Sequence, residues 1–281
     1  MENGEENRAL VAFTWLAPLS VGGALGLLAI RGMNPGAPPD WPDAAPLGVG
    51  VLALAASLLH LSRPRRAFRA LARFSTSWLS REVILFGLFL FFLAVYSLPL
   101  PSSAQEEPRG LAGVPAAVAG LLTLFATGRV YRLPSRPAWD HWSATVSFPL
   151  GALSAGLLLG VTTAGPDAWQ APAGRAAAAV AGTALLLALA ASCIRWSRLR
   201  LGNSEQLAAW RLVTGPYRWA LALRILGCLG ATLVVLVGGP ATNLAWMPAA
   251  LGELGDRVLF FYGVVPISFT ARSGAQTARI Q

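Results

Sequence analysis

The stretch VILFGLFLFFLAVYSLPLPSSAQ, residues Val83–Gln105, has no acidic or basic side chain. A helix needs about 20 apolar residues to cross the hydrocarbon core of a bilayer, so this run is long enough to span a membrane. Charge-free runs recur at Ala9–Ile30, Leu111–Gly128, Trp142–Gly165, Ala176–Ile194 and Ile225–Gly252, and Ala44–Ser62 contains only His60 as a titratable group. The sequence therefore predicts an integral membrane protein.

The composition agrees with this prediction. The chain has 281 residues, of which 55% are hydrophobic and 12% charged, and its mean hydropathy is +0.56. Soluble domains are about 25% charged. The alternating short strands of a membrane β-barrel are absent from the sequence, so the spans are expected to be helices. Without long linkers or repeats, residues 1–281 are interpreted as a single membrane domain.

The run at Ile225–Gly252 is too long for one ordinary span. Gly238, Gly239 and Pro240 interrupt it, and these residue types end helices and form turns. We therefore predict two helices there, at about 216–238 and 242–263. The whole fold is then an all-α bundle of eight transmembrane helices, centred near residues 20, 53, 88, 120, 153, 186, 227 and 253.

The basic residues set the expected orientation. All 22 are arginines. The eight-span topology places most of them on the side that holds both termini and the loops after spans 2, 4 and 6. Cytoplasmic loops of membrane proteins carry such an excess, so this side is predicted to be cytoplasmic. The net charge of +9 then requires no nucleic-acid partner.

The segment LLHLSRPRRAFRALARFSTSWLSREVILF, residues 58–86, concentrates charge between two apolar runs. His60 ends span 2 and Glu82 begins span 3, so both are predicted at similar depth near one membrane face. Imidazole and carboxylate groups there suit proton exchange with a lipid-borne molecule. A second interpretation is an interfacial histidine and an Arg–Glu pair that anchor a loop. Neighbouring arginines can orient the pair or hold anionic groups: Arg65, Arg66, Arg69 and Arg81.

Ionisable residues elsewhere in the spans form further candidates. In GELGDRVLFFYG, Glu253 and Arg257 are four residues apart on one helix face, with Asp256 adjacent. They form either an internal ion pair that holds the last span to its neighbours or the coupling site of a solute transporter. Arg224, within span 7, is a weaker candidate of the same kind.

The segment GRVYRLPSRPAWDHW, residues 128–142, follows span 4 and contributes Arg129 and Tyr131 as secondary candidates. Its aromatic residues Tyr131, Trp139 and Trp142 are interpreted most simply as an interfacial belt. We expect no metal site in this chain. Two interfacial histidines cannot ligate a pair of haems, Cys193 and Cys228 lack C-x-x-C spacing and are expected to be packing residues, and nucleotide, serine-hydrolase and zinc-protease motifs are absent.

Four of these motifs together resemble the membrane-anchor subunit of dimethyl sulfoxide reductase and related molybdopterin oxidoreductases. They are LLHLSRPRRAFRALARFSTSWLSRE, RVYRLPSRPAW, AWR at Ala209–Arg211, and GELGDRVLFFYG. The first is the specific one, because it combines His-Leu-x-x-Pro-x-x-Ala-Phe with Ser-x-Glu about twenty residues later. Ser62 departs from the family pattern, in which glycine is frequent at that position.

The resemblance implies an anchor without haem that lies in a bacterial inner membrane and oxidises menaquinol. Its quinol-binding residues would fall on His60, Glu82 and Arg66, with Arg81 beside them. The implied partners are a ferredoxin-like iron–sulfur subunit and a molybdopterin catalytic subunit. Because this chain shows no electron carrier in its sequence, the quinol site and the iron–sulfur partner are expected at the same, arginine-rich face. The open alternatives are the solute transporter and a scaffold that anchors an enzyme without touching quinol.

Overall fold

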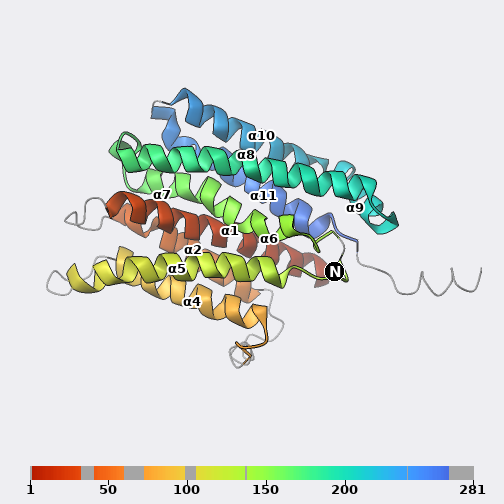
Figure 1. Cartoon of the computed structure of the whole chain (residues 1–281), viewed down its shortest axis with the longest axis horizontal. Coiled ribbons are helices and arrows are strands. Elements are labelled where there is room, and N and C mark those ends of the chain that lie inside the picture. Colours follow the sequence, from red (N-terminus) through yellow and green to blue (C-terminus); the bar gives the residue numbers. More distant parts are fainter. Residues whose placement is uncertain are drawn as a thin grey trace, which may run out of the picture.

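The computed structural model describes residues 2–32, 41–59, 73–98, 106–136, 138–238 and 240–265. Within these ranges every regular element is helical, which confirms the predicted all-α fold. Most of the helices run along one direction and form an elongated bundle (Figure 1). The α-helices are α1 (Glu2–Arg31), α2 (Ala45–Leu59), α4 (Trp78–Ser97), α5 (Glu106–Val130), α6 (Trp142–Gly151), α7 (Leu157–Thr163), α8 (Pro172–Leu201), α9 (Ser204–Thr214), α10 (Arg218–Val237) and α11 (Trp246–Tyr262).

Six helical segments of the described chain are long and apolar enough to cross a membrane. They are Asn7–Arg31 of α1, all of α4, Leu111–Val130 of α5, the continuous α6–α7 segment, α8 and α10. Helices also occupy the two remaining predicted positions, but α2 has 15 residues and α11 has 17, with three charged side chains in the latter. A multi-pass architecture is therefore confirmed, whereas the count of eight crossings is not.

The charge-free run near the C-terminus is divided where the sequence predicts. α10 ends at Val237, a 3-10 turn covers Pro240–Leu244, and α11 begins at Trp246. Gly238 has φ +70°, in the left-handed region that glycine adopts without a steric penalty. The turn brings α11 back against α10, and these two helices form one of the most extensive contacts in the described bundle.

The span from Trp142 to Thr163 is not a regular α-helix. α6 continues into a π-helical turn at Ala152–Gly156, which leads directly into α7. Pro149 lies just before this turn and has no N–H to donate within the helix. Widened turns of this kind commonly accommodate such an interruption.

Close helix crossings depend on glycine. A Cβ atom at Gly156, at the end of the π turn, would lie 2.6 Å from the Cα of Gly22 in α1. A Cβ atom at Gly227 of α10 would lie 2.6 Å from the Cα of Gly252 in α11. Small residues let membrane helices approach backbone to backbone, where dispersion contacts replace the hydrophobic effect. The second crossing positions the charged side chains of α11.

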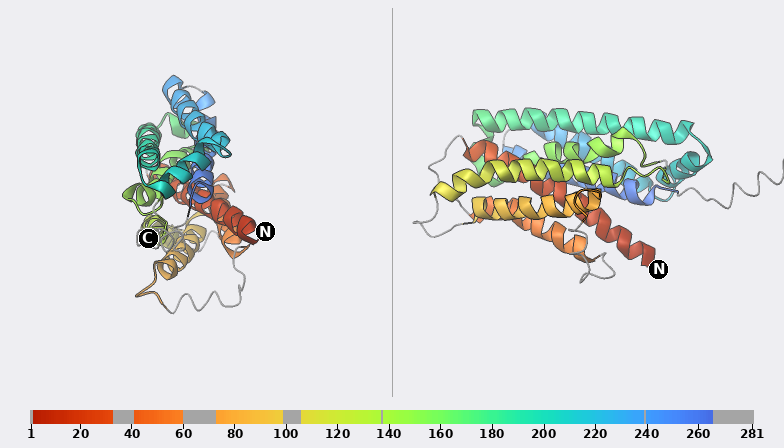
Figure 2. Two further views of the ribbon diagram at one scale, coloured as in Figure 1. Left: turned by 90° about the vertical axis from the view of Figure 1, so that its right-hand side faces the viewer. Right: turned by 60° about the horizontal axis from the view of Figure 1, so that its bottom comes forward.

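The start of α1, the connection from α5 to α6, α9 and the end of α11 lie at the same end of the bundle (Figures 1 and 2). We call it the arginine-rich end. The described arginines that define it are Arg81, Arg129, Arg132, Arg136, Arg198, Arg200, Arg211 and Arg218.

Candidate functional site

Glu82 lies in the second turn of α4, close to the arginine-rich end. The helix starts there because the Ser77 side chain accepts a hydrogen bond from the Ser80 N–H, at 3.3 Å. This start turns Glu82 toward α5, the helix against which α4 packs most extensively, and leaves the residue 4% exposed. Its Oε1 atom lies 2.5 Å from the hydroxyl of Thr127, near the end of α5.

The Thr127 hydroxyl has a second partner, which bears on the proton of Glu82. Its oxygen also lies 3.0 Å from the carbonyl of Thr123, one turn earlier in α5. A hydroxyl has one proton but can accept from another donor. If Thr127 donates to the Thr123 carbonyl, a protonated Glu82 can donate to Thr127, and both bonds form at full strength. The pair is therefore suited to hold a proton on Glu82.

Arg81, another residue predicted at this site, contacts Trp78 and the segment just before α4. Its Nε and Nη2 atoms donate to the carbonyls of Phe74 and Ser75, at 2.9 and 2.6 Å, and its guanidinium stacks 4.3 Å from the centroid of Trp78. Arg129 contacts the same indole, at 5.4 Å. His60 and Arg66 lie outside the described residues, so their predicted roles stay predictions.

Tyr131 directly follows α5 and is buried among aromatic rings. It stacks on Phe148 at 5.8 Å and makes edge contacts with Trp139, Phe260 and Phe261. The predicted interfacial belt is therefore wrong for Tyr131 and Trp139, which are 8% and 5% exposed. Tertiary packing takes them inside, where Trp139 Nε1 donates to the Phe260 carbonyl at 2.6 Å.

The Tyr131 phenol interacts electrostatically with two ionisable groups, Glu82 and Arg257. Burial raises the pKa of Tyr131 well above its usual value, the nearby Glu82 carboxylate adds to the rise, and Arg257 opposes it. The phenol therefore keeps its proton. Through Tyr131, the Glu82 region adjoins a second, deeper group of charges.

That second group is a buried ion-pair network on α8, α10 and α11. The Arg224 guanidinium donates to Glu253, and Glu253 also lies 3.4 Å from Arg257, as the i,i+4 spacing predicts. Arg195 donates to Asp256, which is 3.8 Å from Arg224. All five side chains are at most 8% exposed.

Serine hydroxyls extend the network to neighbouring helices. Ser192 of α8 donates to Asp256 at 3.2 Å, and its oxygen lies 3.4 Å from Arg224 Nε. Ser147 of α6 accepts from Arg257 through its hydroxyl at 3.1 Å and through its carbonyl at 2.9 Å. Buried charges are tolerated only when they are paired and hydrogen-bonded, so the network clamps four helices together.

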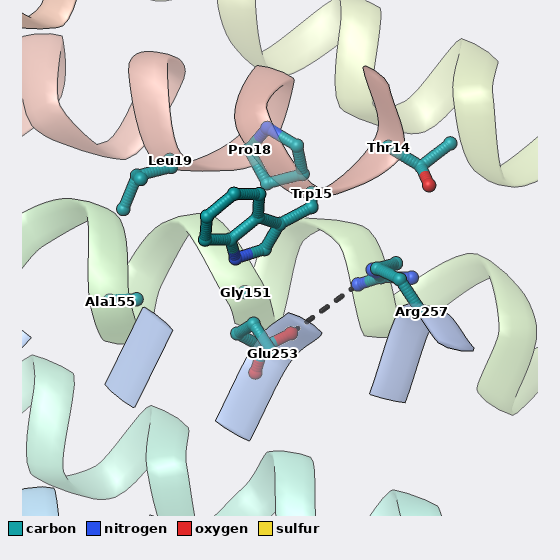
Figure 3. A pocket seen from close by; sticks show the side chains of 8 residues that line it. All are labelled: Thr14, Trp15, Pro18, Leu19, Gly151, Ala155, Glu253 and Arg257. Atoms are coloured by element: carbon teal, nitrogen blue, oxygen red, sulfur yellow. Dashed lines mark hydrogen bonds and ion pairs between the residues drawn. The ribbon is translucent and has the colours of Figure 1, made fainter. Parts of the chain in front are cut away.

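A small hollow adjoins the network between α1, the π turn and α11 (Figure 3). Glu253 and Arg257 line it together with Trp15 and Gly151. A Cβ atom at Gly151 would lie 2.8 Å from Glu253 Oε2, so glycine there makes room for the carboxylate. The hollow has space for about one water molecule and is too small for a quinone ring.

Comparison with known proteins identifies the family. The family model described as "DMSO reductase anchor subunit (DmsC)" matches residues 1–261. The chain belongs to this family. As a member of this anchor family with several membrane-spanning helices it is a multi-pass membrane protein, in agreement with the resemblance noted from its motifs.

Two curated relatives show partial similarity. A chain of the anaerobic dimethyl sulfoxide reductase of Haemophilus influenzae is 30% identical over 118 residues, 40% of this chain and 40% of that protein. A subunit of the sulfite dehydrogenase of Allochromatium vinosum is 34% identical over 121 residues, 38% of this chain and 37% of that protein. The protein thus aligns with about two fifths of the length of each relative.

For several residues of this anchor-family chain, the sequence gives little or no indication of where they lie in the structure. Arg195 follows a charge-free run and is grouped by sequence with the loop arginines, yet it lies inside the bundle. Helical spacing could have shown this, because Ser192, Arg195, Trp196 and Leu199 share the buried face of α8, whereas Arg198 is exposed. Thr127 gives no signal in the sequence. Among the described residues, no three His, Cys, Asp or Glu side chains are grouped as metal ligands.

Proposed function

We propose that this chain is the quinol-oxidising membrane subunit of a molybdopterin oxidoreductase complex that resembles dimethyl sulfoxide reductase. It binds menaquinol at the arginine-rich end and passes electrons to a ferredoxin-like iron–sulfur subunit, which serves a molybdopterin catalytic subunit in anaerobic respiration. The observation that carries the proposal is the buried Glu82–Thr127 pair between α4 and α5. Membership of the DMSO reductase anchor family supports it.

Oxidation of a quinol releases two electrons and two protons, so the site needs proton acceptors. Glu82 accepts one proton from a quinol hydroxyl, and the loaded carboxyl is held by donation to Thr127. His60 is the proposed second acceptor, since neutral imidazole takes up a proton near pH 7. Arg66 and Arg81 supply positive charge near the site. The electrons leave at the same face, where the iron–sulfur partner docks.

We also propose that the arginine-rich end faces the cytoplasm of a bacterium, because arginine excess marks the cytoplasmic side of membrane proteins. For Glu253, Asp256 and Arg257, the internal ion-pair interpretation is favoured over the coupling site of a transporter. Glu253 and Asp256 are each paired with arginines, and the hollow beside them holds about one water molecule. The experiment described next distinguishes a scaffold from a quinol-oxidising subunit.

The decisive test uses the assembled complex in membranes. Glu82→Gln and His60→Ala are expected to abolish substrate reduction driven by a menaquinol analogue. Reduction driven by a dye that feeds the soluble subunits directly should be unchanged. Thr127→Val, which removes the hydroxyl but keeps the shape, should slow the quinol-driven reaction without abolishing it.

The control is Asp167→Asn, which neutralises an exposed carboxylate in the 3-10 turn Pro166–Trp169 and should have no effect. Quinol-driven turnover at the wild-type rate in both Glu82→Gln and His60→Ala would refute the site. If both variants are fully active and no quinol analogue binds the purified complex, the chain is a scaffold.

A further inference from the structure

A single indole at the arginine-rich end contacts two guanidinium groups. Arg81 lies 4.3 Å and Arg129 5.4 Å from the ring centroid of Trp78. Arg81 is fixed by two backbone carbonyls, of Phe74 and Ser75, which are neutral acceptors. Neither arginine is paired with a carboxylate within the part of the chain that the structure describes. The cluster therefore holds two positive charges that the described residues do not neutralise.

The surface below this cluster is apolar and exposed. Along α5, spacings of three and four residues align Arg129 with a stripe of exposed side chains that continues toward the other end of the helix. Trp78 lies at the Arg129 end of the stripe, where its ring makes an edge contact with Phe125, at 5.7 Å between centroids. The stripe consists of Phe125, Leu122, Val118 and Val114, which are 50%, 47%, 50% and 71% exposed.

We propose that Trp78, Arg81 and Arg129 form a binding site for an anionic phospholipid. The phosphate accepts hydrogen bonds from the guanidiniums, and an acyl chain lies along the α5 stripe. Arginine recognises phosphate well because its planar fork matches the phosphate oxygens. Tryptophan is favoured at the membrane interface, where its ring can meet both the headgroup and the chains.

A lipid fits these observations better than a protein partner. The two guanidinium groups lie at one end of a surface of exposed apolar residues on α4 and α5, and fewer than half of the residues in the apolar part of α4 are buried. A phospholipid presents the same order of groups, with the charge at the interface and hydrocarbon below. The site lies on the outer surface of the α4–α5 pair, whereas Glu82 and Thr127 face each other within it.

The test measures lipid retention independently of catalysis. The purified complex is placed in nanodiscs of phosphatidylcholine containing a minor fraction of phosphatidylglycerol or cardiolipin, and bound lipids are counted by native mass spectrometry. Arg129→Gln is the cleanest single variant, because it leaves the loop contacts of Arg81 intact. Each arginine near a membrane surface contributes about 1 kcal/mol, so the double variant with Arg81→Gln should bind anionic lipid roughly 30-fold more weakly.

Matched variants complete the design. Arg198→Gln with Arg200→Gln removes two exposed arginines from the same end of the molecule and should leave lipid retention unchanged. Arg81→Lys with Arg129→Lys keeps the charge and should retain most of the binding. Glu82→Gln should retain all of it, which separates this site from the quinol proposal.

Two results would overturn the proposal. One is equal loss of lipid in both arginine pairs, which indicates unspecific attraction. The other is unchanged lipid retention in the Arg81/Arg129 double variant; if that variant also loses a co-purifying iron–sulfur subunit, the cluster is assigned to that partner.

Discussion

Glu253→Gln tests whether the buried network is a structural clamp. In the wild-type chain three arginines are matched by two carboxylates. The variant leaves Asp256 as the single anion of the network. Arg224 loses its hydrogen-bonded carboxylate, and Arg257 loses its i,i+4 partner at 3.4 Å. Both arginines are only 1% exposed, so water cannot replace the lost charge without opening the bundle.

The size of the effect follows from this burial. Removing one partner of a buried ion pair costs about 3–5 kcal/mol, because the remaining charge stays desolvated. Replacing both partners with apolar residues is often neutral, so Arg224→Met combined with Glu253→Leu should recover much of the loss. The double variant keeps one excess positive charge in the network, as in the wild type.

The assay is reversible unfolding of the purified chain in mixed micelles, followed by tryptophan fluorescence. Asp167→Asn, at an exposed position, serves as the control and should change the free energy of unfolding by less than about 0.5 kcal/mol. The clamp would be refuted if Glu253→Gln were as stable as the control. It would also be refuted if the double variant were less stable than the single one.

Two further predictions concern packing and pH. Gly156→Leu should prevent folding of the span or displace α1, because even a Cβ atom there would lie 2.6 Å from the Cα of Gly22. Size-exclusion chromatography detects the misfolded protein as a loss of monodispersity. The control is Gly182→Leu, at a position with open space around it. Partial burial, then nearby arginines, lower the pKa of His141 from 6.5, and its Nδ1 accepts the Ser143 N–H at the start of α6. Because the unfolded chain then takes up the proton first, stability should fall as the pH drops through 6.5, the ordinary pKa of histidine, and His141→Asn, a neutral cap residue, should weaken this dependence in thermal unfolding. Wild-type pH dependence in His141→Asn would contradict the second prediction.

The sequence predicted those features that depend on local pattern. Apolar run length located the helices, and the Gly-Gly-Pro interruption divided α10 from α11 correctly. The i,i+4 rule paired Glu253 with Arg257. α9 was missed, although Asn203 and Gln206 form a capping box that marks its start in the sequence.

Features that depend on how helices cross could not be predicted. Arg224 meets Glu253 only because Gly227 and Gly252 let α10 and α11 approach closely. Likewise, Thr127 reaches Glu82 through the antiparallel packing of α4 and α5, and nothing in its local sequence distinguishes it from other helix threonines. Hydropathy alone could not show that α2 and α11 are shorter than the other spans, because the length of each helix depends on where it begins and ends.

The π turn at Ala152–Gly156 has a consequence for how this gene can change. A π turn holds one residue more than an α turn, and each residue advances a helix by about 100°. Because the extra residue is taken up within this one wider turn, deleting one residue there would convert the turn to ordinary helix and leave most of α7 in place, whereas deleting a residue within α7 itself, before Gly160, would turn Gly160 away from α1. Single-residue deletions should therefore be better tolerated at this turn than in the regular helix of α6 or α7 on either side of it.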